Sequence, residues 1–151
     1  MMTMRSNAPL KAAVILVCGV ALASCAPKPP SGVNEEALWN ALGDAVGDPN
    51  TCVVLAQAKT GKVIWKYQAL NECGRDLPTC STAGNRTAID LAKLVAGNGA
   101  SVTEGCSNVS WAAGPTPRTG VVYSAVMQGG RALPGMIIAD KLENVFKATG
   151  F

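Results

Sequence analysis

Histidine, aromatic residues and charged residues are scarce in this 151-residue sequence. There is no histidine at all, which removes the commonest general base and the commonest metal ligand among protein side chains. Only 15% of the residues are charged and 5% are aromatic, whereas 48% are hydrophobic. This hydrophobic share excludes an intrinsically disordered chain and indicates a folded core.

Clustered positive charge is also lacking. The formal net charge is +3, but Arg5 and Lys11 lie within the first 24 residues, which have the features of a targeting segment. The remaining 11 of the 13 basic residues face 10 acidic ones, so the rest of the chain is close to neutral. Binding to nucleic acid needs a clustered basic face. We therefore expect no nucleic-acid partner.

The longest early hydrophobic run is too short to cross a membrane. It covers 12 uncharged residues, from Ala12 to Ala23, and follows a short basic start. As a helix it would span about 18 Å, against ~30 Å for the hydrocarbon core of a bilayer. The pattern of a basic start and a short apolar run is typical of a signal peptide rather than of a transmembrane helix.

The run ends in Leu22-Ala23-Ser24-Cys25, which resembles a lipobox, the signal-peptidase-II site of bacterial lipoproteins. The resemblance implies that residues 1–24 are removed and that Cys25 carries a diacylglyceryl group, which anchors the mature chain to a membrane. An ordinary secretory signal that leaves Cys25 free remains the alternative. An anchored lipoprotein requires several acyl chains for stable attachment, because each buried CH₂ contributes only about 0.8 kcal/mol.

Cys25 and the proline-rich tether that follows it together cover residues 25–33. The tether contains three prolines within seven residues, so it favours a stiff, extended chain. The residue after Cys25 is Ala26 rather than aspartate. By resemblance to Gram-negative lipoproteins, this implies sorting to the outer membrane, with the domain facing the periplasm.

The other four cysteines of the exported part are Cys52, Cys73, Cys80 and Cys106. An even number in an exported domain predicts two disulfides, with three connectivities open. A turn-rich stretch between Cys73 and Cys80 favours a local bridge there, which leaves Cys52 to pair with Cys106. A four-thiolate zinc site is the alternative, but the chain lacks the close Cys-x-x-Cys pairs of such sites. We expect no metal and no cofactor.

Hydrophobic periodicity and turn residues predict a single α+β domain over residues 34–151. Helices are expected over 34–46, 87–96 and 134–148. Strands are expected over 51–58, 63–67, 101–103, 109–112 and 121–127, with a break at Gly114–Pro117. Helices packed on an antiparallel sheet bury these faces economically. The order helix, two strands, helix, strands, helix is similar to that of profilin-like and roadblock-like domains.

Residues 52–64 and 77–82 resemble the opening hairpin and active-site approach of class D β-lactamases and penicillin-binding proteins. In that family a Ser-Thr-Phe-Lys tetrad supplies the nucleophilic serine and its lysine base. Here the matching residues are Ser81-Thr82-Ala83-Gly84, without the lysine. We therefore expect Ser81 to have no adjacent proton acceptor and to serve turn or cap chemistry instead.

These observations predict a non-catalytic envelope lipoprotein whose domain binds a protein or cell-wall partner. The alternative is a binder of a small molecule or peptidoglycan fragment, related to penicillin-recognising proteins. A deep pocket near Ser81 would favour that alternative, and a patchy surface would favour the first. Among the three tryptophans, Trp65 is expected in the core, and Trp39 and Trp111 are candidates for a binding surface.

Overall fold

A five-stranded sheet forms the centre of the computed structural model, which describes residues 27–70 and 72–151. The sheet order is β2-β1-β7-β6-β5, and every neighbouring pair is antiparallel. The strands are β1 (Thr51–Gln57), β2 (Val63–Gln68), β5 (Val102–Cys106), β6 (Val109–Pro115) and β7 (Val121–Gln128). The chain therefore crosses from one edge, β2, to the opposite edge, β5, before it returns to the centre.

Three helices cover this sheet, and local sequence signals set their ends. They are α1 (Glu35–Val46), α2 (Ala88–Asn98) and α3 (Gly135–Thr149). The Asn34 side chain caps α1 by accepting a hydrogen bond from the Ala37 N–H at 2.9 Å. Thr87 caps α2 by accepting from the Asp90 N–H at 3.0 Å. Gly99 and Gly150 end α2 and α3 with φ of 66° and 97°, a left-handed conformation that glycine adopts without penalty.

The segment between β2 and α2 holds small elements. A 3₁₀ turn, η1 (Glu72–Gly74), precedes two short paired strands, β3 (Leu77–Pro78) and β4 (Asn85–Arg86). The Glu72 side chain is buried and accepts a hydrogen bond from the Leu70 N–H at 2.8 Å. This segment lies against β1 and α2 and carries Cys73 and Cys80.

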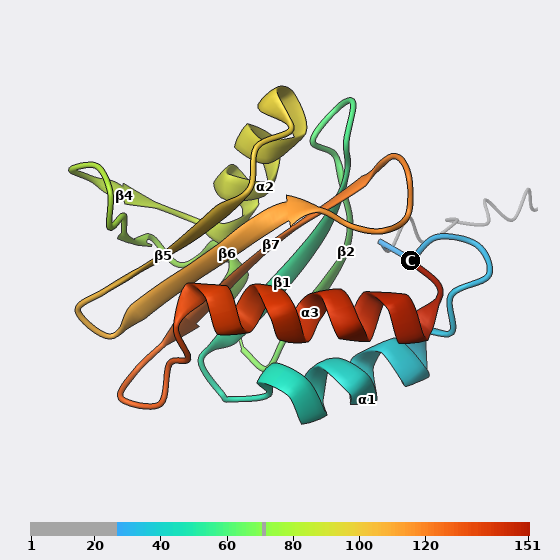
Figure 1. The fold of residues 1–151 in the computed structure, drawn as a ribbon, viewed down its shortest axis with the longest axis horizontal. Helices are drawn as coiled ribbons and strands as arrows, with labels where there is room; N and C mark the ends of the chain where they lie inside the picture. The colour runs from blue at the N-terminus through green and yellow to red at the C-terminus, as the bar shows by residue number, and fades with distance from the viewer. Residues whose placement is uncertain (1–26, 71) are drawn as a thin grey trace, which may run out of the picture.

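The two faces of the sheet carry separate cores. Helices α1 and α3 lie side by side on one face, and α2 covers the other (Figure 1). Alternating residues of β1 divide between the cores, with Val53 and Leu55 toward α1 and α3 and Cys52 and Val54 toward α2. Because both faces are covered, β1 is buried over six consecutive residues, which is why its sequence is a continuous apolar run.

The predicted fold class is confirmed: an antiparallel sheet is flanked by helices in the expected order. The predicted break at Gly114–Pro117 is wrong in its position. Strand β6 continues to Pro115, which pairs with Val122 of β7, and the chain turns only after it. Proline is tolerated there because Pro115 is the last residue of the strand and needs to donate no further ladder bond.

Candidate functional site

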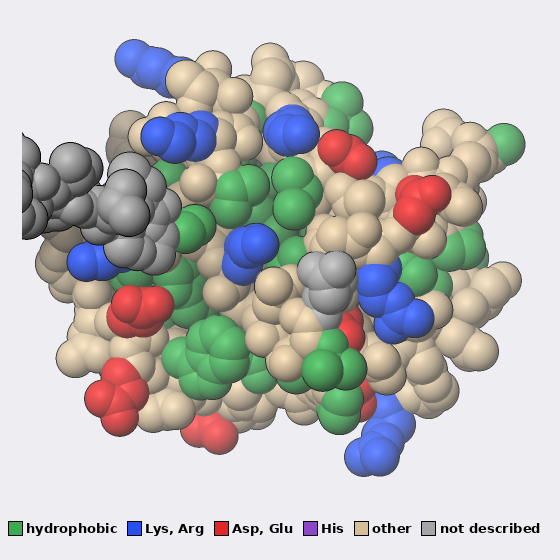
Figure 2. All heavy atoms as spheres, turned by 180° about the vertical axis from the view of Figure 1, so that it is seen from behind, with side chains coloured by type: hydrophobic (Ala, Val, Ile, Leu, Met, Phe, Trp, Pro, Cys, Tyr) green, Lys and Arg blue, Asp and Glu red, His purple; other side chains and the backbone are tan. Residues whose placement is uncertain are grey.

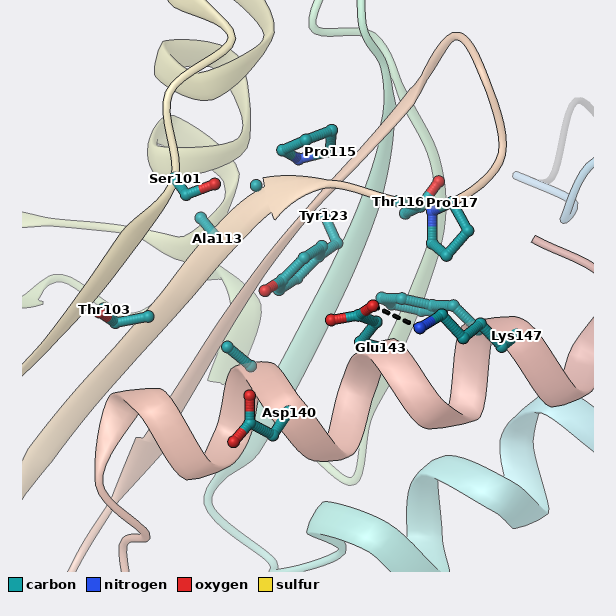
Figure 3. Close-up of a pocket in the computed structure, with 13 residues that line it drawn as sticks. Ser101, Thr103, Ala113, Pro115, Thr116, Pro117, Tyr123, Asp140, Glu143 and Lys147 are labelled. Carbon is teal, nitrogen blue, oxygen red and sulfur yellow. Dashed lines mark ion pairs between the residues drawn. The ribbon is translucent and has the colours of Figure 1, made fainter.

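A pocket of about 400 Å³ lies between α3 and the outer strands of the sheet, β6 and β5 (Figure 3). Its walls combine apolar and polar side chains. Pro115, Pro117 and Phe146 supply apolar surface, whereas Thr103, Asp140 and Glu143 supply hydroxyl and carboxylate groups. This combination of an apolar cavity with a few convergent polar groups is typical of a ligand site.

The pocket forms because α3 touches the sheet at its first residue and leaves room along its later turns. A Cβ on Gly135 would meet the Trp111 carbonyl oxygen at 2.5 Å and the Glu104 backbone nitrogen at 2.8 Å. Only glycine allows this approach of helix to strands. Farther along the helix, the small residue Ala139 of α3 and the small residue Gly114 of the facing strand β6 line the hollow rather than fill it.

Tyr123 of β7 is the central side chain of this pocket. It is only 7% exposed, and its ring packs against Phe146 with 5.3 Å between centroids. Its hydroxyl end points into the pocket (Figure 3), has no hydrogen-bond partner within residues 27–70 and 72–151, and is open to solvent there, since it is not among the buried unpaired atoms. Burial raises the pKa of Tyr123 to about 12, and the charges of Glu143 and Asp140 add to the effect. The hydroxyl therefore stays protonated at neutral pH.

Acidic groups dominate the charge of the pocket. Asp140 and Glu143 are three residues apart on α3, which places them on one side of the helix. Glu143 pairs with Lys147 at 2.5 Å, but both side chains are more than half exposed. In the described part of the chain, Asp140 has no ion-pair partner. The site thus offers hydrogen bonds and negative charge to a ligand.

Sequence reasoning missed this pocket, although one signal was present. Ile138, Leu142 and Phe146 form the buried stripe of α3. The acidic residues Asp140 and Glu143 lie beside this stripe in the helix sequence. The inward hydroxyl of Tyr123 carried no such signal, because an aromatic residue in an apolar strand indicates a core position.

Ser81 lies on the other side of the sheet, in the loop between β3 and β4. It does not open or cap a helix, since Thr87 caps α2. The expectation that Ser81 lacks a neighbouring acceptor is also wrong. Its backbone N–H and its hydroxyl both donate to the Glu104 carboxylate, which lies 23 residues away in sequence. The sequence did not indicate this contact, because Glu104 is distant in sequence and only the folded sheet brings β5 next to the loop that holds Ser81.

Arg86 completes the cluster around Glu104. The guanidinium pairs with the Glu104 carboxylate and lies over the Trp111 ring, 4.9 Å from its centroid. Burial lowers the pKa of Arg86 from its usual value. The indole N–H of Trp111 in turn donates to the Pro78 carbonyl at 2.9 Å. This network ties the β3–β4 loop to β5 and β6, so Ser81 is one contact in a structural bridge.

All four remaining cysteines form disulfides, but the preferred pairing was wrong. Cys52 bonds Cys73, and Cys80 bonds Cys106, with Cα separations of 5.1 and 5.4 Å. A Cys52–Cys106 bond is excluded by the sheet order, because β7 and β6 lie between β1 and β5. Three strand spacings put these residues about 14 Å apart, well beyond the reach of a disulfide.

The tryptophans divide between core and surface. Trp65 is buried as expected, and its indole N–H donates to Glu35 at 2.9 Å. Trp111 is fully buried, which excludes it from a binding surface. Trp39 is 42% exposed and packs on Tyr67 with 4.6 Å between centroids. On the rear face, hydrophobic side chains reach the surface in separate groups, with charged side chains between them (Figure 2).

The predicted lipidation residue, Cys25, lies outside the described residues, as do the rest of the lipobox-like segment and the predicted signal peptide. The following tether is held against the domain at its end. Arg118 donates to the Ser31 carbonyl at 3.1 Å and to the Gly150 carbonyl at 3.4 Å. A turn closed by the Val33 N–H and the Pro30 carbonyl at 3.1 Å, with Gly32 at φ 87°, leads into α1.

Neither a membrane-spanning helix nor a metal-binding group is present in the part of the chain that the structure describes. No helix there combines the length and hydropathy needed to cross a bilayer. No three side chains of the metal-ligating types come together there.

Comparison with known proteins gives a limited result. No protein-family model and no curated protein matches the chain. Among solved structures, it is similar to MglB of Myxococcus xanthus, with 16% identity and a TM-score of 0.44 over 77% of this chain and 92% of that one. It is also similar to the gliding protein MglB from Thermus thermophilus, with 16% identity and a TM-score of 0.45 over 80% and 99%. At these values the similarities carry no conclusion about function.

Proposed function

We propose that this protein is a lipid-anchored, non-catalytic binding module of a bacterial cell envelope. The lipobox-like Leu22–Cys25 segment supports the anchor, and the two disulfides are consistent with an oxidising compartment. Ala26 after the anchor supports the outer membrane as its location. In this proposal the domain faces the periplasm on a tether whose Ser31 is held by Arg118 of the domain.

The pocket beneath α3 is the observation that carries the binding role. It is about 400 Å³, within the range of small-molecule sites, and the hydroxyl of a largely buried tyrosine and two carboxylates face it. Its occupant is a small molecule or a side chain presented by a protein or cell-wall partner. The exposed Trp39 offers a second contact surface, but it is a single aromatic group rather than a cavity.

The surroundings of Ser81 support the non-catalytic part of the proposal. Its hydrogen-bond acceptor, Glu104, is paired with Arg86 and accepts the Ser81 backbone N–H as well as the hydroxyl. Activated serines usually rely on histidine or lysine as base, and this chain has no histidine. A pocket favours the small-molecule alternative, but this pocket lies on the face of the sheet opposite to Ser81. Side chains alternate along β5: Thr103 lines the pocket, whereas the next residue, Glu104, faces α2 and contacts Ser81.

The anchor is tested by Cys25→Ala. We expect the variant to accumulate as an unprocessed precursor and to take up no labelled fatty acid, because the sulfur that accepts the lipid is gone. Wild-type protein and Cys18→Ala, which changes the other cysteine of the first 25 residues, serve as positive controls. Fatty-acid label that persists on Cys25→Ala would refute the lipoprotein assignment.

The binding role is tested by photocrosslinking in intact envelopes. A photoreactive amino acid at Thr103, at the exposed rim of the pocket, is compared with one at Lys93, which is exposed on α2. We expect a discrete adduct at position 103 and none at position 93. Equal labelling at both positions, or none at either, would count against a binding site in this pocket.

A further inference from the structure

We propose that the pocket beneath α3 binds a protonated amine with a short apolar portion, held by Tyr123, Asp140 and Glu143. This inference rests on the proposed binding function of the same pocket and names the chemistry of its occupant. The charge of the pocket, its inward-pointing hydroxyl and its shape each support an amine.

The two exposed carboxylates at the pocket attract a positive charge. Asp140 lines the pocket without an ion-pair partner in the described chain. Glu143 has only Lys147, in an exposed pair one helical turn away. Exposed pairs of this kind contribute little to stability, so an incoming ammonium group can replace the Lys147 ammonium at small cost. The Lys147 contact itself shows that the pocket rim accommodates an ammonium group.

The Tyr123 hydroxyl is the second, independent feature. It belongs to a side chain more than nine-tenths buried, points into the pocket and lacks a partner in the described chain. The hydroxyl oxygen is not among the buried unpaired atoms of the described residues, so it is open to the pocket, where a ligand can replace water as its hydrogen-bond partner. This oxygen can accept a hydrogen bond from an ammonium group. The adjoining rings of Tyr123 and Phe146 add aromatic surface, which attracts cations.

The walls limit the rest of the ligand. Pro115, Pro117 and Ala139 form apolar surface around a volume of about 400 Å³, which suits a short alkyl portion beside the charged group. A neutral polar ligand would gain no charge–charge attraction from the two carboxylates, which are exposed and otherwise solvated by water. An anionic ligand would be repelled by both.

The position of the pocket allows two sources of such an amine. Pro117 lies next to Arg118, whose guanidinium holds the tether at Ser31. The six residue-to-residue steps from Cys25 to Ser31 reach at most about 22 Å, so an anchored domain stays near the bilayer. A phospholipid amine headgroup and a soluble amine both meet the chemistry of the site.

The test uses the mature lipoprotein in detergent, titrated with n-butylamine and, as the neutral counterpart of similar size, butan-1-ol. Binding is followed by NMR signals of Tyr123 and the α3 backbone. We expect butylamine to bind at least about tenfold more tightly than butanol. Asp140→Asn with Glu143→Gln should weaken butylamine binding at least about tenfold and leave butanol unchanged. Asp76→Asn, a neutralised acid on an exposed loop, is the matched control and should change neither.

Equal affinities for the two probes, or an unchanged butylamine affinity in the double variant, would overturn the amine inference. The adduct at position 103 would then still support the binding function, so the two proposals fail separately. Repeating the titration in nanodiscs identifies the source. Weaker butylamine binding in phosphatidylethanolamine than in phosphatidylcholine discs, which have the same net charge but no N–H on the headgroup, assigns the amine to a lipid headgroup, and equal binding assigns it to a soluble ligand. Melting temperatures verify that each variant is folded.

Discussion

The two faces of the sheet are held by different means. On the α2 face, Cys52–Cys73 and Cys80–Cys106 join strands β1 and β5 to the segment that precedes the helix. The Ser124 hydroxyl donates to the Ala88 carbonyl, which draws α2 close to β7. On the opposite face, α1 and α3 are held mainly by apolar packing, with Phe146, Tyr123 and Phe151 in one aromatic cluster and one hydrogen bond from Trp65 to Glu35 of α1.

This difference separates stability from binding. Covalent bonds and a buried polar network fix the α2 face, so that face has little freedom to admit a ligand. The α3 face lacks such bonds and contains the pocket of about 400 Å³. A chain of this size has only a modest core, and disulfides are a common means by which small exported domains gain stability. The bonds on one face therefore permit an incompletely filled core on the other.

The largest expected effect comes from removing the buried disulfide. Cys52→Ala with Cys73→Ala should lower the free energy of unfolding by about 3–5 kcal/mol, in the upper part of the range for small exported domains. Both cysteines are fully buried, so the change adds packing loss to the freedom gained by the unfolded chain. Chemical denaturation followed by tryptophan fluorescence measures the difference.

The second disulfide provides the matched comparison. Cys80 and Cys106 are only partly buried, and the sequence separations of the two bonds are similar, 26 and 21. Cys80→Ala with Cys106→Ala should therefore cost less, about 2–3 kcal/mol. A larger loss for this pair would contradict the assigned role of burial. Peptide mapping of the unreduced protein should recover the two pairings seen in the structure.

Alkaline pH should act on the α3 face through its tyrosines, because both tyrosines of the chain lie there. The pKa of Tyr123 is raised to about 12, and burial also raises the pKa of Tyr67. The neutral phenol is the form that the fold favours, so its contribution is complete below about pH 10. It is lost as the pH rises toward 12, and a shift of two pKa units corresponds to at most about 2.7 kcal/mol.

Tyr123→Phe checks this expectation, since phenylalanine keeps the ring and removes the titrating group. Unfolding free energies at pH 9 and pH 12 should differ less in the variant than in the wild type. A residual alkaline loss is expected from Tyr67. Identical pH dependence of the two proteins would show that Tyr123 is not the group responsible.

Removing a helix cap should lower the free energy of unfolding by a similar amount on both faces of the sheet. Such a result would show that the difference between the two faces does not come from the intrinsic stability of their helices. Asn34→Ala removes the cap of α1, and Thr87→Ala removes that of α2. Each should cost about 1 kcal/mol. Thr119→Ala, on an exposed turn, is the control and should change stability by less than about 0.5 kcal/mol. A cap effect confined to one helix would place part of the contrast in the helices themselves.

The fold was predictable from sequence because its signals are local. Asn34 and Thr87 mark helix starts, glycines mark helix ends, and alternating or continuous apolar runs mark the strands. Each of these depends on residues within a few positions of one another. The order of elements then restricts the architecture, since the apolar faces of helices and strands must be covered.

The site was not predictable to the same degree, because it depends on contacts between distant segments. The pairing of Cys52 with Cys73 follows from the position of β1 within the sheet, which the sequence does not state. Glu104 reaches Ser81 only through the alternation of side chains along β5. The pocket exists because Gly135 fixes one end of α3 on the strands, and a glycine at a helix start is not by itself a signal of a cavity.

The smallest expected effect is that of Ser81→Ala. The change removes an exposed hydroxyl that donates to Glu104, while the Arg86–Glu104 pair and the Cys80–Cys106 bond still hold the loop. Stability should change by less than about 0.5 kcal/mol. Neither the wild type nor the variant should form a covalent adduct with a fluorescent penicillin, because Ser81 lacks the lysine or histidine base of activated serines. General-base assistance typically contributes 10²–10⁴-fold to the rate of such reactions. Mass spectrometry of the intact protein measures the adduct. An adduct present on the wild type and absent from Ser81→Ala would show that Glu104 activates the serine, and it would move the functional site from the α3 face to the disulfide-bonded one.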